Sequence, residues 1–412
     1  MSSEHTINTG SCCLVGRGKT VYTDEEAELH AKEVGVPPRP METKNEIDET
    51  GAFIRQPNAF IQKFGNGANE LKAEANRYGI YWAKGCNWSN RPVIVRDLLG
   101  LEQVISDTLC THSGESNKYG HGFGDAKDHR DPATGAYFLS EFYKRANPDF
   151  KGRATTPTFV DVIEKKAVNN DYHRLTNYIE VQFRPFQPKD APDLYPKAFR
   201  AEIDEFNDWL FPHINNGHYR MAFCQSLSAY NEAFEDFFDS MDKIEKRLET
   251  NRFLFGDYVT DSDVRFFVTL ARWDTSYYKN VGPLKHRIVD YKNIWAYARE
   301  LCAIPAFKKN TYFKDLALGN HGKPSEGIFQ DYQSRIVPQI DFEELWKPDD
   351  SRKHLSKTPD ELFLRHPANE TAEDYYSDIS DTIWNSPNQV DRNPKNGTLS
   401  VDASINPLKG KL

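Results

Sequence analysis

The sequence predicts an α/β unit followed by an all-helical unit. Short apolar and aromatic runs alternate with helix-period segments between residues 78 and 183, which is the pattern of strands and helices packed together. A linker rich in Pro and Asp follows at 184–196, and beyond it the apolar residues recur with helical spacing. The chain has 412 residues, which is enough for two hydrophobic cores.

The first 77 residues precede this pattern. Residues 1–50 are polar and broken by prolines, so we expect a flexible leader with one exposed helix over 24–33. Residues 51–77 predict an extended lead-in that wraps the α/β unit. We therefore place the α/β domain at 51–185, with this lead-in as its first part.

The α/β elements follow in order. The run Tyr-Gly-Ile-Tyr-Trp-Ala at 78–83 predicts a buried strand, and 92–99 has the pattern of an amphipathic helix. The expected elements after these are a strand at 104–109, a Gly- and His-rich loop at 111–134, a helix at 137–145, a hairpin of strands at 155–161 and 166–169, and a helix ending near 183. Asn170 and Asp171 have the right side chains to cap that last helix.

The helical unit is expected at 196–340. Its helices are predicted near 197–214, 227–250, 262–277 and 291–302. Thr260 and Asp263 fit a capping box at the start of the third helix, with Val259 and Val264 as a hydrophobic staple. The last segment, 341–412, is charged and rich in proline, so we expect it to be extended or disordered.

Composition excludes several classes of function. The net charge of −9 gives no basic face for nucleic acid. No apolar stretch approaches the roughly 18 residues of a membrane span, and the first residues do not resemble a secretory signal, so we expect a cytoplasmic protein. The six cysteines form no Cys-x-x-Cys pair and no Cys/His cluster, so we expect neither a disulfide framework nor a metal site.

One cysteine has the position of a nucleophile. Cys86 stands between the strand at 78–83 and the helix at 92–99. Free N–H groups and the positive dipole end of a helix start favour a thiolate, which is the reactive form of cysteine. Arg91, one turn further on, adds a permanent positive charge. These features predict that Cys86 is a redox nucleophile.

The surroundings of this cysteine resemble one family. Residues 86–91 read Cys-Asn-Trp-Ser-Asn-Arg and are similar to the signature Cys-Pro-Trp-Ala-His-Arg of the xi-class glutathione transferases, or glutathionyl-hydroquinone reductases. Further matching segments are Phe-Ile-Arg at 53–55, Gly-Leu-Glu at 100–102, Asn-Pro-Asp-Phe-Lys-Gly-Arg at 147–153, Asn-Asn-Gly-His-Tyr at 215–219 and Lys-His-Arg-Ile-Val-Asp-Tyr at 285–291. The resemblance covers roughly residues 51–335. It implies a thioredoxin-like domain, an all-α glutathione-transferase domain and a homodimer.

The resemblance also implies roles for individual residues. Cys86 falls on the family's nucleophile and Tyr219 on a tyrosine of its quinone site. The positions that correspond to glutathione contacts are Tyr119, Arg153, Thr156, Pro157 in a cis peptide bond, Asp171 and Tyr172. Three positions depart from the family: Tyr172 replaces a serine, Asn87 replaces the proline, and a second active-site tyrosine aligns with Gly322.

The implied activity is a monothiol reductase cycle. Cys86 would attack a glutathionyl-hydroquinone type of thioether, release the aromatic quinol, and be freed by a second glutathione that leaves as the disulfide. A glutathione-conjugating transferase is one alternative, although that chemistry uses a Ser or Tyr hydroxyl in place of the cysteine. A non-catalytic, transferase-like scaffold is the other, because of the departures at Asn87, Tyr172 and Gly322.

Overall fold

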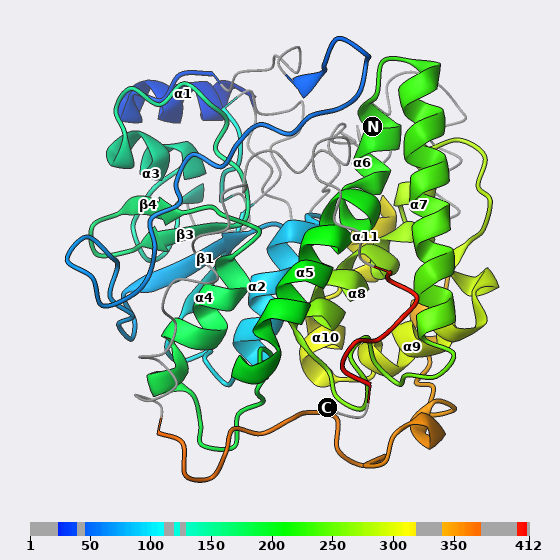
Figure 1. Cartoon of the computed structure of the whole chain (residues 1–412). Helices are drawn as coiled ribbons and strands as arrows, with labels where there is room; N and C mark the ends of the chain where they lie inside the picture. Colours follow the sequence, from blue (N-terminus) through cyan, green and yellow to red (C-terminus); the bar gives the residue numbers. More distant parts are fainter. Residues whose placement is uncertain are drawn as a thin grey trace, which may run out of the picture.

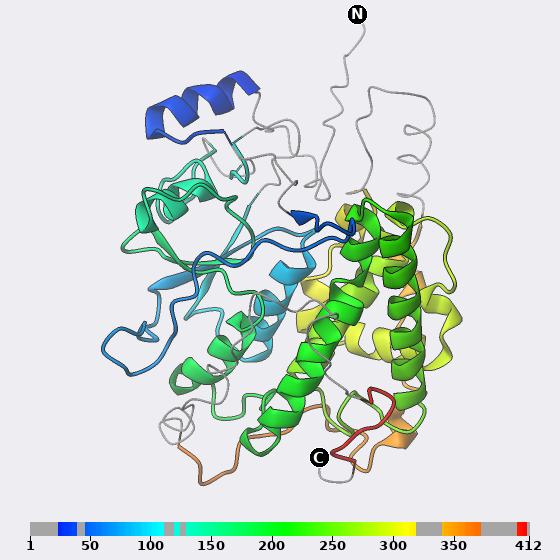
Figure 2. The same ribbon diagram turned by 45° about the horizontal axis from the view of Figure 1, so that its top comes forward.

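The computed structural model describes residues 24–38, 46–110, 119–123, 129–318, 340–371 and 402–409. An α/β unit and a helical unit lie side by side (Figures 1 and 2), which confirms the predicted fold class. The first unit contains β1 (Tyr78–Trp82), α2 (Asn87–Leu98), β2 (Ser106–Leu109), α3 (Leu139–Ala146), β3 (Thr158–Asp161), β4 (Lys166–Asn169) and α4 (Leu175–Gln182). The second contains α5 (Arg200–Leu210), α6 (Gly217–Phe223), α7 (Leu227–Arg247), α8 (Asp261–Trp273), α9 (Lys292–Cys302), α10 (Pro305–Lys309) and α11 (Phe313–Leu318).

The four strands form one mixed sheet in the order β2-β1-β3-β4. β1 is parallel to β2, as expected for strands joined through a helix, while β3 is antiparallel to both β1 and β4. Alternate side chains point to opposite faces. Ile80 and Trp82 pack with the residues of α2 and α4, whereas Tyr81 and Val160 pack with α3. The sheet therefore lies between α2 and α4 on one face and α3 on the other (Figure 1).

Two helix starts differ from the sequence prediction. α2 begins at Asn87, five residues before the expected start, so that Cys86 is its N-terminal cap and Pro92 lies inside it. α4 begins at Leu175. The Asp171 carboxylate accepts from the backbone N–H of His173 at 3.1 Å, so Asp171 caps the turn before this helix and not the helix itself.

The central helix of the second unit is α8, whose residues are buried throughout. Its predicted capping box is confirmed: Asp263 accepts from the backbone N–H of Thr260 at 2.7 Å and from its hydroxyl at 2.9 Å. A single π-helical turn at Phe211–Asn215 separates α5 from α6. This turn and α6 carry the 215–219 motif to the side of the unit that faces α2.

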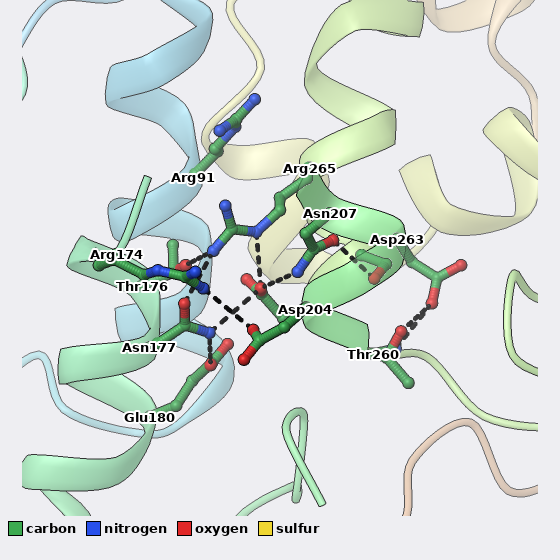
Figure 3. A network of polar contacts seen from close by, with 12 residues as sticks. Arg91, Arg174, Thr176, Asn177, Glu180, Asp204, Asn207, Thr260, Asp263 and Arg265 are labelled. Carbon is green, nitrogen blue, oxygen red and sulfur yellow. Dashed lines mark hydrogen bonds and ion pairs between the residues drawn. The ribbon is translucent and has the colours of Figure 1, made fainter. Parts of the chain in front are cut away.

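A buried polar network joins the two units (Figure 3). Arg265 of α8 pairs with Asp261 at 2.6 Å and donates to Thr176 at 2.9 Å and Asn177 at 3.1 Å, both in α4. Asn177 in turn donates to Glu180 at 3.1 Å. Because buried charges are stable only when they are paired, this network fixes α4 against α8 and holds the two units in one arrangement.

The leader is partly packed, contrary to our expectation of a flexible segment. Helix α1 (Asp24–Val34) confirms the predicted helix, but Ala27 and Ala31 are fully buried against Tyr137 and Phe138. The small apolar face of this helix was sufficient to dock it on the residues directly before α3. Residues 46–54 form a small hairpin closed by an Ile47–Phe53 bridge.

The described parts of the tail contain little regular structure beyond one short helix and a 3₁₀ turn at Lys353–Leu355, and they are packed. Phe342 and Trp346, in and just after α13 (Phe342–Leu345), join the main core. Arg352 donates to the carbonyl of Leu248 at 2.8 Å, and residues 402–409 return to the same unit through buried Leu408. The segment 346–371 (orange in Figure 1) runs along the lower edge of the molecule. The apolar residues scattered among its charges account for this packing.

No helix within the described ranges combines the length and apolar character needed to cross a membrane.

Candidate active site

Cys86 lies at the junction of β1 and α2. Its backbone is extended (φ −79°, ψ 117°), and its carbonyl accepts from the N–H groups of Ser89 and Asn90 in the first turn. The thiol is half-buried, and Sγ is 3.4 Å from the carbonyl oxygen of Thr156. The peptide bond between Thr156 and Pro157 is cis, as predicted. The structure therefore brings Cys86 and the Thr156–Pro157 pair together.

Arg91 supplies a buried positive charge behind the thiol. Its guanidinium lies 4.7 Å from the Trp88 ring and donates to Asn215 at 2.6 Å. Burial lowers the pKa of Arg91 to about 9, Arg265 acts in the same direction, and Cys86 is near enough to oppose the shift. Because even this lowered pKa leaves the guanidinium protonated at neutral pH, a positive charge is held within electrostatic range of the thiol.

Tyr219 reaches the same helix start from the second unit. Its hydroxyl donates to Oδ1 of Asn87 at 3.3 Å and lies 3.1 Å from the hydroxyl of Tyr277. Its ring stacks on Trp88 with centroids 5.8 Å apart. Since Asn87 and Trp88 directly follow Cys86, the predicted nucleophile and the predicted quinone-site tyrosine belong to one site.

Arg55 is a member of this site that the sequence analysis did not assign. Its guanidinium lies 4.3 Å from the Tyr219 ring and 4.8 Å from the Trp88 ring, and Nε donates to Asn216 at 2.7 Å. The available signal was the Phe-Ile-Arg match at 53–55. That match placed the lead-in within the family pattern without indicating that the arginine enters the site.

Tyr172 packs at the boundary between the two units. Its ring centroid is 5.1 Å from that of Trp88, 4.4 Å from His173 and 5.8 Å from Phe211. Asp171, directly before it, is fully buried and accepts from Asn58 at 3.2 Å. The ring is therefore held in an aromatic wall next to the turn where the resemblance places the γ-glutamyl end of glutathione.

Arg153 is engaged within the chain. Its guanidinium pairs with the buried carboxylate of Glu46 at 2.6 Å, and the same carboxylate accepts from the backbone N–H of Gln56 at 3.2 Å. No sequence signal marked Glu46, because it lies in the polar leader outside the region of resemblance. The structure thus places a carboxylate on the arginine that was predicted to bind one.

Tyr119 and Arg153 share a small cavity of about 60 Å³. Its other lining residues are Pro37, Pro38, Gly120, Ser140, Lys144, Phe150, Lys151, Gly152 and Ala154. Neither Cys86 nor Thr156 lines it. The predicted site residues therefore fall into two groups. Cys86, Thr156, Pro157 and Tyr219 lie around the start of α2, together with Tyr172 on Trp88 and the neighbouring Asp171, whereas Tyr119 and Arg153 lie at this cavity.

The other described cysteines have different surroundings. Cys110 and Cys302 are buried, and burial raises the pKa of both thiols, that of Cys302 to about 12. Burial also raises the pKa of Cys224. Within the described ranges, no three His, Cys, Asp or Glu side chains gather closely enough to hold a metal ion. Cys12, Cys13 and Gly322 lie outside the described residues.

A thioredoxin-like unit with a cysteine at a helix start beside a cis-proline, followed by an all-helical unit, is the arrangement of a glutathione transferase. The family model described as glutathione S-transferase, C-terminal domain, matches residues 228–300. The glutathionyl-hydroquinone reductase YqjG of Escherichia coli is 33% identical over 252 residues, which cover 60% of this chain and 75% of that protein. The glutathionyl-hydroquinone reductase PcpF of Sphingobium chlorophenolicum is 34% identical over 244 residues, 59% of this chain and 76% of that protein.

Solved structures agree with these relatives. The crystal structure of the xi glutathione S-transferase from Phanerochaete chrysosporium matches with a TM-score of 0.65 at 30% identity, over 74% of this chain and 97% of that one. A glutathione-bound structure of E. coli YqjG matches with a TM-score of 0.61 at 29% identity, over 73% and 96%. The chain belongs to the glutathionyl-hydroquinone reductase family, the xi class of the glutathione transferases.

Proposed function

We propose that this protein is a glutathione-dependent reductase that uses Cys86 in a monothiol cycle to reduce glutathionyl-quinol thioethers. The observation that carries the proposal is the geometry of the thiol: it caps α2, has the buried Arg91 charge behind it, and lies 3.4 Å from the carbonyl of Thr156 before cis-Pro157. A thiolate so placed is both accessible and electrostatically supported. Two relatives are named glutathionyl-hydroquinone reductases, which agrees with this chemistry.

The cycle has two steps, each an attack by a thiolate on sulfur. The ring carbon that bears the sulfur first takes up a proton while a ring hydroxyl gives one up, which yields the keto form of the quinol. The Cys86 thiolate then attacks the glutathionyl sulfur, a Cys86–glutathione disulfide forms, and the electron pair of the broken carbon–sulfur bond moves through the ring to the carbonyl oxygen, which takes up a proton. A second glutathione, as its thiolate, attacks the mixed disulfide, and glutathione disulfide leaves with the Cys86 thiolate restored. The two electrons that reduce the aromatic compound come from two glutathione sulfurs.

The glutathionyl half of the substrate would lie along the α/β unit. The backbone of Thr156 faces the thiol and can pair with the cysteinyl part of the tripeptide. Asp171 and Tyr172 stand at the turn before α4, where we place the γ-glutamyl end. Tyr119 and Arg153 would hold a carboxylate of glutathione, which requires that Glu46 leave Arg153.

The aromatic half would lie on the side of the second unit. Trp88, Tyr172 and Phe211 offer a wall of rings, and Tyr219 offers a hydroxyl that can hold or protonate a quinol oxygen. Conjugation of glutathione and a scaffold role, the two alternatives predicted from the sequence, are less well supported than reduction because the relatives at 33% and 34% identity are named as reductases.

The test is to follow the thiol during turnover. The protein is incubated with a glutathionyl-quinol such as the glutathione conjugate of menadiol, without free glutathione. The mass of the peptide that contains Cys86 is then measured by mass spectrometry. We expect one glutathione on Cys86 and one equivalent of free quinol, and neither product with Cys86→Ser. Quinol release by Cys86→Ser at the rate of the unchanged protein would contradict the proposal.

We further propose that the protein works in the cytoplasm and as a homodimer, both implied by the family resemblance. Light scattering coupled to size-exclusion chromatography checks the dimer, because the chain mass is 47.4 kDa and a dimer has twice that value.

A further inference from the structure

Asn87 occupies the position next to the thiol where the family signature has proline. It is the first residue of α2 and is fully buried. Its side-chain oxygen accepts the hydrogen bond from the Tyr219 hydroxyl at 3.3 Å. Proline is well suited to the first position of a helix but has no side-chain acceptor or donor. The asparagine therefore adds a polar link between the thiol's helix and the aromatic side of the site.

The other end of this amide is unused. Asn87 Nδ2 is buried and has no hydrogen-bond partner among the described residues. Leaving a buried donor unpaired is unfavourable because the donor has lost its water, and such groups in native proteins call for an explanation such as a ligand or an ordered water. The carbonyl end is committed to Tyr219, so the amide nitrogen is the end that is left for a ligand.

Two neighbouring groups share this condition. Arg55 Nη2 and both ring nitrogens of His218 are buried without a partner among the described residues. Arg55 lies over the Tyr219 ring at 4.3 Å, and His218 stacks at 3.8 Å on Tyr277, whose hydroxyl is 3.1 Å from that of Tyr219. The residues that carry these unpartnered atoms therefore all contact Tyr219 or its neighbour Tyr277, which points to a place for a polar ligand atom beside Tyr219.

The hydrogen-bonding capacity of these groups determines which kind of ligand atom they can bind. The Nδ2 group of Asn87 and the Arg55 guanidinium can only donate hydrogen bonds, so they favour an oxygen acceptor on the ligand. Burial lowers the pKa of His218 to about 3, with Arg55 acting in the same direction, so this imidazole is neutral and can also donate through one nitrogen. An oxygen that becomes electron-rich during the reaction would be stabilised by such donors.

We propose that Asn87 determines the specificity of the acceptor site: its carbonyl fixes the Tyr219 hydroxyl, and its amide nitrogen donates to an oxygen on the aromatic ring of the substrate. The substrate class is a glutathionyl thioether of an aromatic ring that carries hydroxyl groups. This inference rests on the proposed function and assigns Asn87 a role within it. As the carbon–sulfur bond breaks, its electron pair is delocalised onto the ring oxygens, and the donor is placed to stabilise that charge.

The test compares two substrates of the same enzyme. The first is the glutathione conjugate of menadiol, which carries ring oxygens; the second is the mixed disulfide of glutathione and thiophenol, whose ring has none. With Asn87→Ala and with Asn87→Pro we expect kcat/KM for the first to fall at least tenfold, which corresponds to about 1.4 kcal/mol. The rate with the mixed disulfide should change less than twofold, because attack by Cys86 needs no oxygen on the ring.

Ser89→Ala is the matched control. Ser89 lies two residues further along α2, is equally buried, and its hydroxyl also lacks a partner among the described residues. We expect this variant to leave both rates unchanged. A double-mutant cycle with Tyr219→Phe separates the two contacts of Asn87. The effect of Asn87→Ala on the quinol substrate should shrink in the Tyr219→Phe background without vanishing, because the Nδ2 contact remains.

The outcomes are distinct. Equal losses with both substrates would mean that Asn87 merely supports the helix start and would overturn the inference. So would an active enzyme in which Asn87→Ala and Asn87→Pro retain full activity on the quinol substrate. A wild-type protein that attacks neither substrate would contradict the proposed function itself, and the inference with it.

Discussion

Glu46 and Arg153 form a partly buried ion pair of 2.6 Å that ties the hairpin at residues 46–54 to the loop before cis-Pro157. The other end of the hairpin is fixed to the second unit, since Gln225 donates to the carbonyl of Gly51 and Ser226 to that of Thr50, each at 2.7 Å. The hairpin thus spans the two units beside the proposed glutathione site. It holds the arginine that the family resemblance assigns to glutathione.

Removing the Glu46 carboxylate should tighten glutathione binding. In Glu46→Ala the Arg153 guanidinium is left unpaired, so a glutathione carboxylate no longer has to displace a bound one. A hydrogen bond to a charged group contributes about 1.5–3 kcal/mol, so we expect the Kd measured by calorimetry to fall by about tenfold. Arg153→Met should weaken binding by a similar factor.

The control for this experiment is Glu74→Ala. Glu74 forms an ion pair of similar length, 2.7 Å, with Arg77 at the surface. Arg77 directly precedes β1, at the opposite end of the strand from the thiol. Its loss should leave the Kd for glutathione unchanged. If Glu46→Ala weakens binding while Glu74→Ala does not, the hairpin supports the site and does not compete for it.

Cys86→Ala should remove reductase activity with little loss of stability. The thiol is half-buried, and its hydrogen bond to the Thr156 carbonyl is a weak one at 3.4 Å. We expect a loss of at least ~10²-fold in kcat and a change in Tm of less than about 3 °C, by steady-state kinetics and calorimetry. Cys224→Ala, which removes another half-buried thiol, should leave the kinetics unchanged.

The sequence predicted the parts of this site that depend on local structure. Cys86 could be placed at a helix start because an apolar strand and a helical pattern flank it, and the family signature added the cis bond at Thr156–Pro157. Position 87 was recognised as a departure, but its bond to Tyr219 crosses 132 residues of chain. Pairings of that kind depend on the packing of the two units, which no local pattern encodes.

The leader and the tail show the same limit at the level of the fold. Helix α1 was predicted from its composition, yet its docking depends on two alanines that meet Tyr137 and Phe138 from a distant segment. In the tail, prolines and charges predicted an extended or disordered segment, but the described parts pack against the second unit. A few apolar residues anchor the tail, such as Trp346 and Leu408. They have little effect on the mean composition of the segment, which its charged residues and prolines dominate.

His218 should make the protein sensitive to acid. The buried ring stays neutral in the folded state because its pKa is lowered to about 3, whereas in the unfolded chain it takes up a proton near pH 6.5. Stability contributed by the neutral ring is therefore present above pH 6.5 and is lost as the pH falls from there towards 3, by up to about 1.4 kcal/mol per unit. Thermal unfolding in buffers from pH 8 to pH 4.5 measures this loss.

His218→Phe keeps a ring against Tyr277 and removes the titration, so its Tm should fall less between pH 8 and pH 4.5 than that of the unchanged protein. His366 is a second buried imidazole, with a pKa lowered to about 4. His366→Phe should flatten the curve by nearly the same amount over this range, because pH 4.5 lies above the lowered pKa of both rings. Parallel curves for His218→Phe and the unchanged protein would mean that His218 is protonated in the fold.

Tyr172 allows the sharpest test of whether glutathione is the thiol, because stability and binding should change in opposite directions. Its ring contacts Trp88 and Phe211, so Tyr172→Ser opens a gap in the aromatic wall and should cost about 2 kcal/mol of stability. The serine hydroxyl matches the family residue at the proposed γ-glutamyl end and leaves room for the ligand. We expect glutathione to bind about 1 kcal/mol more tightly by calorimetry. Tyr172→Phe separates the ring from its hydroxyl: it should preserve both stability and the weak binding of the unchanged protein. If Tyr172→Ser weakens binding and Tyr172→Phe does so too, the phenol hydroxyl is itself a contact to the ligand, and the ring is no obstruction.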